Sequence, residues 1–416
     1  MSSRSHPRPP TGVIGGAVAA GSVLVAGAVF AGAMTTGVAR RMVGPGRRRT
    51  AVTTVLGVDP AAGRIRFAPT DDAALPGVYS FWFDEGRGHA RVGRILDRTP
   101  VAVTRELLGV DAGDITTATE GRFNGWVYLT PEQLDVPWED VRIQTTLGVV
   151  PAWEVPAEGF DSPRWAILVH GRRTVRQEVL RAVPVFHRAG WSTLLVSYRD
   201  DGEAPSSSSP KYGLEDAEWL DVESAVLHAL DQGAREVVLV GFSMGGAIVL
   251  QTAMRSRLQA VISGVVLDSP VLDFAEALLH QGDATRLPAP VRRGALSLVG
   301  SRLGPLLTGQ DEPFDTRGAE VVARVADLDV PVLVLHSEDD GIAPIDVSRR
   351  LAAERPDVVR LVPFTTARHT KLWNYDRERW EGAVRAWLTN DEAALAALSG
   401  TPPTGRRQRR GRAQRA

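Results

Sequence analysis

The pentapeptide Gly241-Phe242-Ser243-Met244-Gly245 places one serine between two glycines, a spacing that suits a nucleophilic hydroxyl. An apolar run, Val237–Val240, leads into it, and Ala247–Met254 predicts a helix directly after it. A strand, a Gly-x-Ser-x-Gly turn and a helix in this order predict a nucleophile elbow. The two glycines remove Cβ atoms that would collide in so tight a turn. We therefore predict that Ser243 is a nucleophile at a helix N-terminus, where the positive dipole end lies beneath the hydroxyl.

A serine hydroxyl is a poor nucleophile at neutral pH and needs a base that removes its proton. The chain has eight histidines, and His369 is the best placed of them, because it lies in a loop between the last predicted strand and the last predicted helix. His336 is the alternative base, although its place at a strand end suits packing and hydrogen bonding. We therefore predict that His369 acts on Ser243.

Short apolar runs alternate with helical patterns from Trp165 onward, and this alternation predicts a parallel sheet covered on both faces. The apolar runs are Ala166–Val169, Thr193–Val196, Val237–Val240, Val265–Leu267, Val332–Leu335 and Arg360–Val362. The helical patterns are Val175–Ala189, Leu214–Gln232, Ala247–Arg257, Ile345–Glu354 and Tyr375–Leu388. Sites in such sheets form at the carboxyl ends of the strands. His170-Gly171-Arg172, Ser243, His336–Pro344 and Ala367–Thr370 follow four of these ends.

These strings resemble the α/β-hydrolase superfamily over residues 151–390. The chain is similar to bacterial hydrolases that pair a Val-His-Gly turn with Gly-x-Ser-Met-Gly-Gly, Leu-Asp-Ser-Pro and His-Thr-x-x-Trp-Asn. The corresponding strings here are Val169–Gly171, Gly241–Gly246, Leu267–Pro270 and His369–Asn374. The resemblance implies an α/β-hydrolase fold with a doubly wound, mainly parallel sheet at residues 151–395, a catalytic triad and an oxyanion hole.

The resemblance also implies the acid that orients His369. Asp340 aligns with the acidic position of the family pattern His-Gly-x-x-Asp-x-x-x-Pro, in which Ser337 replaces the usual glycine. Asp339 and Asp268 are the alternatives.

An oxyanion hole needs two backbone N–H groups. We expect these from Met244, which follows the nucleophile, and from Arg172 in the loop after His170-Gly171. Residues 271–327 are longer than a normal crossover, and in this family such an insertion forms a lid. Its leucines would either line an acyl pocket or be buried within the insertion; they are Leu278, Leu279, Leu296, Leu298, Leu306 and Leu307.

Residues 51–150 show short alternating stretches separated by Gly, Pro and Asp, which predicts a small antiparallel β domain. The stretches are Arg64–Phe67, Val78–Phe83, Val101–Thr104, Trp126–Leu129 and Val141–Thr146. His89, in a Gly-Arg-Gly-His turn, is expected to be a solvated loop residue.

The two ends of the chain are basic, although the net charge of the whole is only −1. Residues 1–10 form a basic tail, and residues 396–416 an Arg-rich tail expected to be disordered. Residues 11–39 hold no charged residue and are long enough to span a bilayer. The heavier arginine flank after this segment predicts a single-pass anchor with the catalytic domain in the cytoplasm. The alternative is export on a signal peptide with Ala31-Gly32-Ala33 as the cleavage site.

The absence of cysteine excludes disulfides, thiolate zinc sites and cysteine nucleophiles. Basic ends on an acidic body argue against a nucleic-acid-binding core. No metal or organic cofactor is implied. The sequence thus predicts a membrane-anchored serine hydrolase that cleaves a carboxylic ester of a small acyl-bearing substrate. The alternatives are a thioesterase or peptidase of the same fold, or a non-catalytic interaction protein that keeps the scaffold.

Overall fold

A computed structural model of the chain describes residues 29–40, 52–159, 162–206, 217–284, 287–309 and 327–399. The chain divides into two compact units. The smaller comprises residues 1–46 and 282–315, and the larger comprises residues 47–281 and 316–416. The larger unit holds an eight-stranded sheet and a closed six-stranded barrel.

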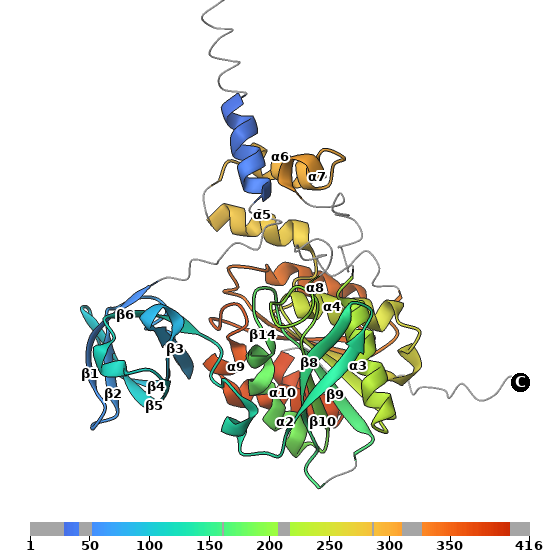
Figure 1. Ribbon diagram of the computed structural model, residues 1–416, viewed down its shortest axis with the longest axis horizontal. Coiled ribbons are helices and arrows are strands. Elements are labelled where there is room, and N and C mark those ends of the chain that lie inside the picture. Colours follow the sequence, from blue (N-terminus) through green and yellow to red (C-terminus); the bar gives the residue numbers. More distant parts are fainter. Residues whose placement is uncertain are drawn as a thin grey trace, which may run out of the picture. The chain divides into compact units, whose positions relative to one another are not determined.

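The eight-stranded sheet has the order β14-β13-β12-β11-β9-β10-β8-β7 (Figure 1). Strands β9 to β14 pair in parallel, and β8 and β7 add an antiparallel edge. The strands are β7 (Glu139–Thr145), β8 (Gly148–Val155), β9 (Arg164–Val169), β10 (Ser192–Val196), β11 (Glu236–Phe242), β12 (Ile262–Asp268), β13 (Val332–Ser337) and β14 (Val359–Phe364). This arrangement confirms the predicted α/β-hydrolase fold.

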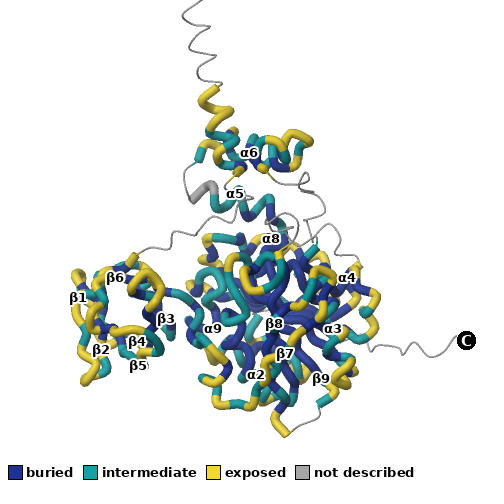
Figure 2. The backbone as a smooth tube through the Cα atoms, viewed as in Figure 1, coloured by how far each residue is buried: buried dark blue, intermediate teal, exposed yellow. Residues whose placement is uncertain are grey.

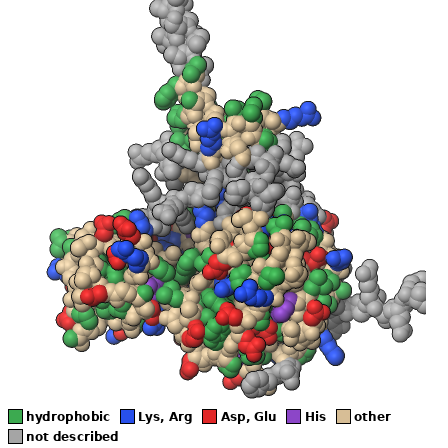
Figure 3. Space-filling view, viewed as in Figure 1, with side chains coloured by type: hydrophobic (Ala, Val, Ile, Leu, Met, Phe, Trp, Pro, Cys, Tyr) green, Lys and Arg blue, Asp and Glu red, His purple; other side chains and the backbone are tan. Residues whose placement is uncertain are grey.

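Helices cover both faces of the sheet, and the buried residues in Figure 2 gather between them and the strands. One face packs against α3 (Trp219–Asp231), α4 (Met244–Arg255) and α8 (Ile345–Glu354). The other face packs against η4 (Arg176–Ala182), α2 (Val183–Arg188), α9 (Leu372–Tyr375), α10 (Arg377–Leu388) and α11 (Glu392–Ser399). Consecutive strand residues point to opposite faces, so each parallel strand must be apolar throughout. On the outside, acidic and basic side chains are interspersed over the face that Figure 3 displays.

The direction of the chain across the sheet reverses at β9. Strand β9 lies between β10 and β11, so the chain runs out to β10 and returns to β11 on the other side. The connections at such a point leave a crevice at the carboxyl ends of the strands, where open α/β sheets bind ligands. Residues 170–174 follow β9 at this crevice, and Ser243 follows β11.

The barrel closes in the order β1-β2-β5-β4-β3-β6, with every neighbouring pair antiparallel. Its strands are β1 (Thr53–Asp59), β2 (Arg64–Phe67), β3 (Tyr79–Phe83), β4 (Gly88–Thr99), β5 (Ala102–Ala112) and β6 (Glu120–Asn124). Phe67, Phe81 and Phe123 meet in its core with ring centroids 4.8 to 5.3 Å apart. The predicted β-rich N-terminal domain is therefore confirmed as a barrel.

One cation lies inside this apolar core. Arg105 on β5 has no exposed surface, and its guanidinium donates hydrogen bonds to the carbonyl oxygens of Gly93, Ala73, Leu75 and Gly77. Burial lowers the pKa of Arg105 to about 10, which leaves it charged at neutral pH. The side chain thus ties the segment between β2 and β3 to the barrel wall.

Two expectations for residues 51–150 are wrong. Strands β7 and β8 belong to the eight-stranded sheet, not to the barrel, so the β domain does not extend to residue 150. Strands β7 and β8 mix buried positions with exposed or half-buried ones, as the barrel strands do, and the sequence pattern does not separate the two. His89 lies on β4 and is fully buried, with Nδ1 2.8 Å from Asp111 Oδ2 and Nε2 3.3 Å from the Trp126 carbonyl oxygen. Burial lowers the pKa of His89, since its bonds to Trp126 and Asp111 do not compensate for the lost hydration.

The described part of the smaller unit comprises the helix at residues 29–40, α6 (Ala289–Val299) and α7 (Gly304–Thr308). Arg40 Nε donates to the Leu307 carbonyl oxygen at 2.7 Å. Helix α5 (Phe274–Ala284) crosses the boundary between the units. The predicted lid at 271–327 includes α5, α6 and α7, and Leu306 is 79% exposed. The lid role stays a prediction, and residues 285–286 and 310–326 lie outside the described residues.

The ends of the chain are described only in part. In the ranges given above, no helix has both the length and the apolar character needed to cross a membrane. The basic tail at 1–10 and most of the predicted anchor, residues 11–28, lie outside the described residues, as do residues 400–416. The expected disorder from residue 396 onward is wrong for 396–399, because α11 extends to Ser399 and packs through the buried Leu395.

We predict that Arg105→Met destabilises the barrel by about 3 kcal/mol or more, because it leaves buried carbonyl oxygens without donors. Denaturant unfolding followed by tryptophan fluorescence measures the change. Arg94→Met is the matched control, since the Arg94 side chain is 79% exposed and its loss should change stability by at most about 0.5 kcal/mol. Equal stability of both variants would contradict the role assigned to Arg105.

Candidate active site

Ser243 occupies a strained turn between β11 and α4. Its backbone has φ 54° and ψ −119°, a conformation that residues other than glycine rarely adopt. A Cβ atom at Gly241 would lie 2.3 Å from the Gly245 carbonyl oxygen, and one at Gly245 would lie 2.4 Å from the Val169 carbonyl oxygen. Neither contact is tolerable, so both positions require glycine. The turn leaves Ser243 partly exposed between the buried Phe242 and Met244.

Three predicted residues from distant loops meet at this turn. His369 Nε2 lies 2.8 Å from Ser243 Oγ, and His369 Nδ1 lies 2.8 Å from Asp340 Oδ2. The His369 side chain is only 8% exposed, and that of Asp340 is fully buried. Nδ1–H donates to the carboxylate, so Nε2 is left as the acceptor for the serine proton. This is the order that activation of a serine hydroxyl requires.

Asp340 is held as an anion. Its Oδ1 accepts hydrogen bonds from the backbone N–H groups of Ile342 and Ala343 at 2.8 and 2.9 Å. Burial opposes its ionisation, but attraction to His369 and hydrogen bonds from His336 and His369 outweigh burial and hold the pKa of Asp340 well below its usual range. His280 on α5 lies against the same loop, with Nε2 2.9 Å from the Asp340 carbonyl oxygen. The carboxylate is therefore charged at any pH at which His369 can act as a base.

The alternative base and acids occupy other positions. His336 lies with Nδ1 2.7 Å from Ser348 Oγ and Nε2 3.1 Å from the Ala343 carbonyl oxygen, which fits a supporting role beside Asp340. Asp268 is fully buried, and it accepts hydrogen bonds from Trp380 Nε1 and Ser269 Oγ at 2.8 and 2.9 Å. Burial raises the pKa of Asp268, despite the nearby Arg181.

Two serines that sequence reasoning did not assign hold the loop of His369. The Thr370 N–H donates to Ser269 Oγ at 3.0 Å, and the Ala367 N–H donates to Ser337 Oγ at 3.1 Å. Ser269 lies in the Leu-Asp-Ser-Pro string, which marked the residue but not its role. Ser337 stands where the family pattern has glycine, and its hydroxyl accepts a hydrogen bond from the His369 loop that a glycine could not accept.

The loop after β9 lies against the serine. A Cβ atom at Gly171 would lie 3.0 Å from Ser243 Cβ. The Gly171 N–H donates to Glu178 Oε2 at 2.8 Å, and the Gly171 carbonyl oxygen accepts from the Tyr198 hydroxyl at 2.9 Å. Both backbone groups of Gly171 are therefore bonded within the protein, and the assignment of the Arg172 N–H to the oxyanion hole stays a prediction.

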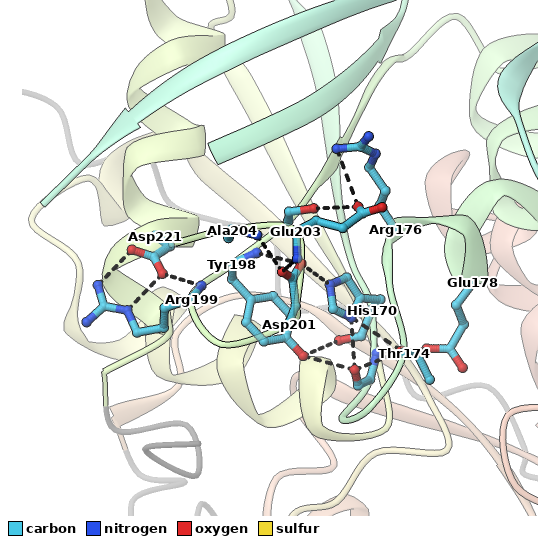
Figure 4. A network of polar contacts seen from close by, with 12 residues as sticks. His170, Thr174, Arg176, Glu178, Tyr198, Arg199, Asp201, Glu203, Ala204 and Asp221 are labelled. Carbon is cyan, nitrogen blue, oxygen red and sulfur yellow. Dashed lines mark hydrogen bonds and ion pairs between the residues drawn. The ribbon is translucent and has the colours of Figure 1, made fainter. Parts of the chain in front are cut away.

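A network of buried polar side chains contacts the loop after β9 (Figure 4). His170 Nε2 lies 3.2 Å from Asp201 Oδ2, and the His170 ring stacks on Tyr198 with centroids 4.3 Å apart. Burial opposes ionisation of Asp201, but the bond to His170 keeps its pKa below the usual range. His170 is thus a structural residue that fixes the loop rather than a second base. Within the described ranges, no group of three or more His, Asp and Glu side chains could hold a metal ion.

We predict that Gly245→Ala destabilises the protein by about 2–3 kcal/mol, because the new methyl group collides with backbone at the end of β9. The reactivity of Ser243 should fall with it, since the turn cannot move without moving this serine. Gly382→Ala is the control: a Cβ atom there meets nothing within 4 Å in α10, and alanine should stabilise the helix by about 0.5–1 kcal/mol. Denaturant unfolding of both variants measures this, and an unchanged stability of Gly245→Ala would contradict the packing described.

Comparison with known proteins covers both domains. A family model described as alpha/beta hydrolase family matches residues 166–386, and one described as a domain of unknown function (DUF8805) matches residues 54–124, which form the barrel. The chain is 28% identical to an uncharacterized protein of Mycobacterium tuberculosis, Rv2307c, over 60% of this chain and 79% of that protein. It is 22% identical to the uncharacterized protein YqkD of Bacillus subtilis, over 60% of this chain and 81% of that protein.

Solved structures with a similar fold include the esterase Pf2001 of Pyrococcus furiosus, with a TM-score of 0.48 and 17% identity over 63% of this chain and 94% of that chain. The esterase RhEst1 of a Rhodococcus species has a TM-score of 0.42 and 18% identity over 60% of this chain and 98% of that chain. The matching family model spans more than half of the sequence. With its eight-stranded sheet, the tight turn at Ser243 and the reversal of strand order at β9, the chain belongs to the alpha/beta hydrolase family.

Proposed function

We propose that the protein is a serine hydrolase that cleaves carboxylic esters through an acyl-enzyme. The observation that carries the proposal is the succession Ser243 Oγ, His369 and Asp340, with both hydrogen-bond distances at 2.8 Å. The fold does not require a strained serine, a base and a buried anion to lie in this order. Their convergence costs backbone strain, which proteins keep mainly at functional sites.

The reaction follows from the geometry. His369 Nε2 takes the proton of Ser243 Oγ as the oxygen attacks the substrate carbonyl carbon, and Asp340 stabilises the imidazolium that forms. The negative charge on the carbonyl oxygen is received by the N–H groups of Met244 and Arg172. His369 then gives its proton to the leaving alkoxide, so an alcohol departs and the acyl group stays on Ser243. Water, deprotonated by His369, attacks the acyl-enzyme and releases the acid.

An ester is preferred to an amide as the proposed substrate because an alkoxide is a better leaving group than an amide anion. The same three residues could also cleave a thioester or an amide. Rates measured with p-nitrophenyl esters, acyl thioesters and anilides of increasing chain length show which of the three bonds the enzyme prefers. Attachment of the enzyme to a membrane through residues 11–39 remains a prediction from the sequence, and the catalytic proposal does not depend on it.

We predict that Ser243→Ala abolishes labelling by a fluorophosphonate probe and lowers kcat for ester hydrolysis on the order of 10⁴-fold or more. The variant removes the attacking oxygen and leaves the fold intact. Ser263→Ala is the control and should label like wild type. Ser263 lies near the start of β12, at the edge of the sheet away from Ser243. Persistent labelling of Ser243→Ala, or no labelling of the folded wild type, would refute the proposal in favour of a non-catalytic scaffold.

We predict that Asp340→Asn lowers kcat about 10³–10⁴-fold. The asparagine oxygen would keep the two backbone N–H partners of Oδ1, so its amide NH₂ would face His369 Nδ1. The imidazole would then carry its proton on Nε2 and could not accept one from the serine. Asp339→Asn, one residue away with a side chain that is 56% exposed, makes the same charge change and should alter kcat by no more than about twofold. Steady-state kinetics of both variants decide between the two carboxylates, and a larger loss in Asp339→Asn would reverse the assignment.

A further inference from the structure

The loop that carries His369 is strained on both sides of the imidazole. This His loop, residues 365–371, joins β14 to α9. Arg368 and Thr370 flank His369 and have φ values of 62° and 50°. Each such residue costs about 1–3 kcal/mol and persists only where the surroundings fix it. The position of the imidazole therefore depends on what holds the neighbouring residues.

The barrel supplies part of this hold through one carboxylate. Asp72, in the segment between β2 and β3, has Oδ1 2.9 Å from Arg368 Nη1 and 3.1 Å from Lys371 Nζ. The side chains of Asp72 and Lys371 are only 14% and 17% exposed. The Arg368 side chain is 31% exposed. Ion pairs that are partly shielded from solvent are less screened than surface pairs. One anion thus bridges two cations that flank His369 in sequence and would otherwise repel each other.

The segment that carries Asp72 is fixed against the catalytic domain just beyond the His loop. The Val78 N–H donates to the Asn374 carbonyl oxygen at 2.9 Å, and Asn374 Nδ2 donates to the Val78 and Gly125 carbonyl oxygens at 2.8 and 3.0 Å. A Cβ atom at Gly77, where φ is +114°, would lie 1.9 Å from the Asn374 carbonyl oxygen. The two chains therefore pack backbone to backbone at this point.

The same segment is fixed on its other side by the barrel core. Arg105 donates to the carbonyl oxygens of Ala73, Leu75 and Gly77 at 2.6 to 3.0 Å. A continuous series of contacts thus leads from the barrel interior through Asp72 to the residues beside His369. On the barrel side the series consists of backbone carbonyl groups bonded to one buried cation, and on the side of the His loop it consists of the Arg368 and Lys371 side chains.

We propose that the barrel is a positioning domain for the catalytic base, and that Asp72 is the positioning residue through which it acts. This inference rests on the proposed serine hydrolase function. Asp72 has no part in the chemistry, and it acts by holding Arg368 and Lys371 so that the imidazole stays between Ser243 and Asp340. Its removal should therefore lower kcat and leave substrate binding unchanged.

The test compares Asp72→Asn with Asp71→Asn in the full-length chain. The Asp71 side chain is 95% exposed, and its Oδ2 lies 3.9 Å from Arg368 Nη2. The two variants therefore lose the same charge, but only Asp72→Asn loses a close ion pair with the His loop. We expect Asp72→Asn to lower kcat for a p-nitrophenyl ester about tenfold, as misplacement of a catalytic group by a fraction of an ångström does, with KM within about twofold of wild type. Asp71→Asn should match wild type in both constants. Equal kcat values for wild type and Asp72→Asn would overturn the inference.

A second readout separates this inference from the proposed function. Hydrogen exchange of peptides covering residues 365–371 should be faster in Asp72→Asn than in Asp71→Asn, because the Ala367 and Thr370 amides lose protection when the loop relaxes. If the wild type hydrolyses no ester and takes no fluorophosphonate, the proposed function fails, and this exchange alone decides whether the barrel holds the loop. Unchanged exchange would overturn the inference. If Asp72→Asn does not fold, Lys371→Gln breaks the other arm of the bridge, and the same two results are expected of it.

Discussion

The left-handed backbone of Ser243 is the constraint on which the rest of the structure depends. A residue with a Cβ atom is stable there only if the strand before it and the helix after it are held firmly. The Ser243 N–H donates to the Asp268 carbonyl oxygen at 2.9 Å, and the Val271 N–H donates to the Ser243 carbonyl oxygen at 3.1 Å, so β12 and the residues after it secure the turn. Helices on both faces of the sheet supply the burial that balances the strain. The apolar core is therefore what keeps the hydroxyl at the crevice.

The electrostatics of the site follow from one buried anion shared by two imidazoles. Asp340 lies 2.8 Å from His369 Nδ1 and 3.3 Å from His336 Nε2, and two backbone N–H groups complete its hydrogen bonding. Because the carboxylate stays ionised, the orientation of His369 is fixed before substrate arrives. The loops on either side are fixed by different means: the loop after β9 by the buried His170–Asp201 pair, and the His loop by two serines and the barrel.

Sequence reasoning recovered the features that have a local cause. The parallel strands appear as continuous apolar runs because both of their faces are buried, and Ser243, Asp340 and His369 follow strand ends in the order expected of the family. The remaining features depend on tertiary contacts that leave no local pattern. Nothing near Asp72 indicates that it meets Arg368 almost 300 residues later. Arg105 in the barrel core and His89 on the other face of β4, beside Trp82, are both fully buried although they are polar, because groups outside their own strands accept their hydrogen bonds.

In the proposed reaction, three loops bring a hydroxyl, an imidazole and two N–H groups to one reacting atom. The most direct measurement is a crystal structure of the full-length protein after reaction with a fluorophosphonate. We expect phosphorus bonded to Ser243 Oγ, the phosphoryl oxygen within hydrogen-bond distance of the N–H groups of Met244 and Arg172, and His369 Nε2 beside the adduct. An adduct on another residue, or a phosphoryl oxygen turned away from both N–H groups, would contradict the proposed reaction.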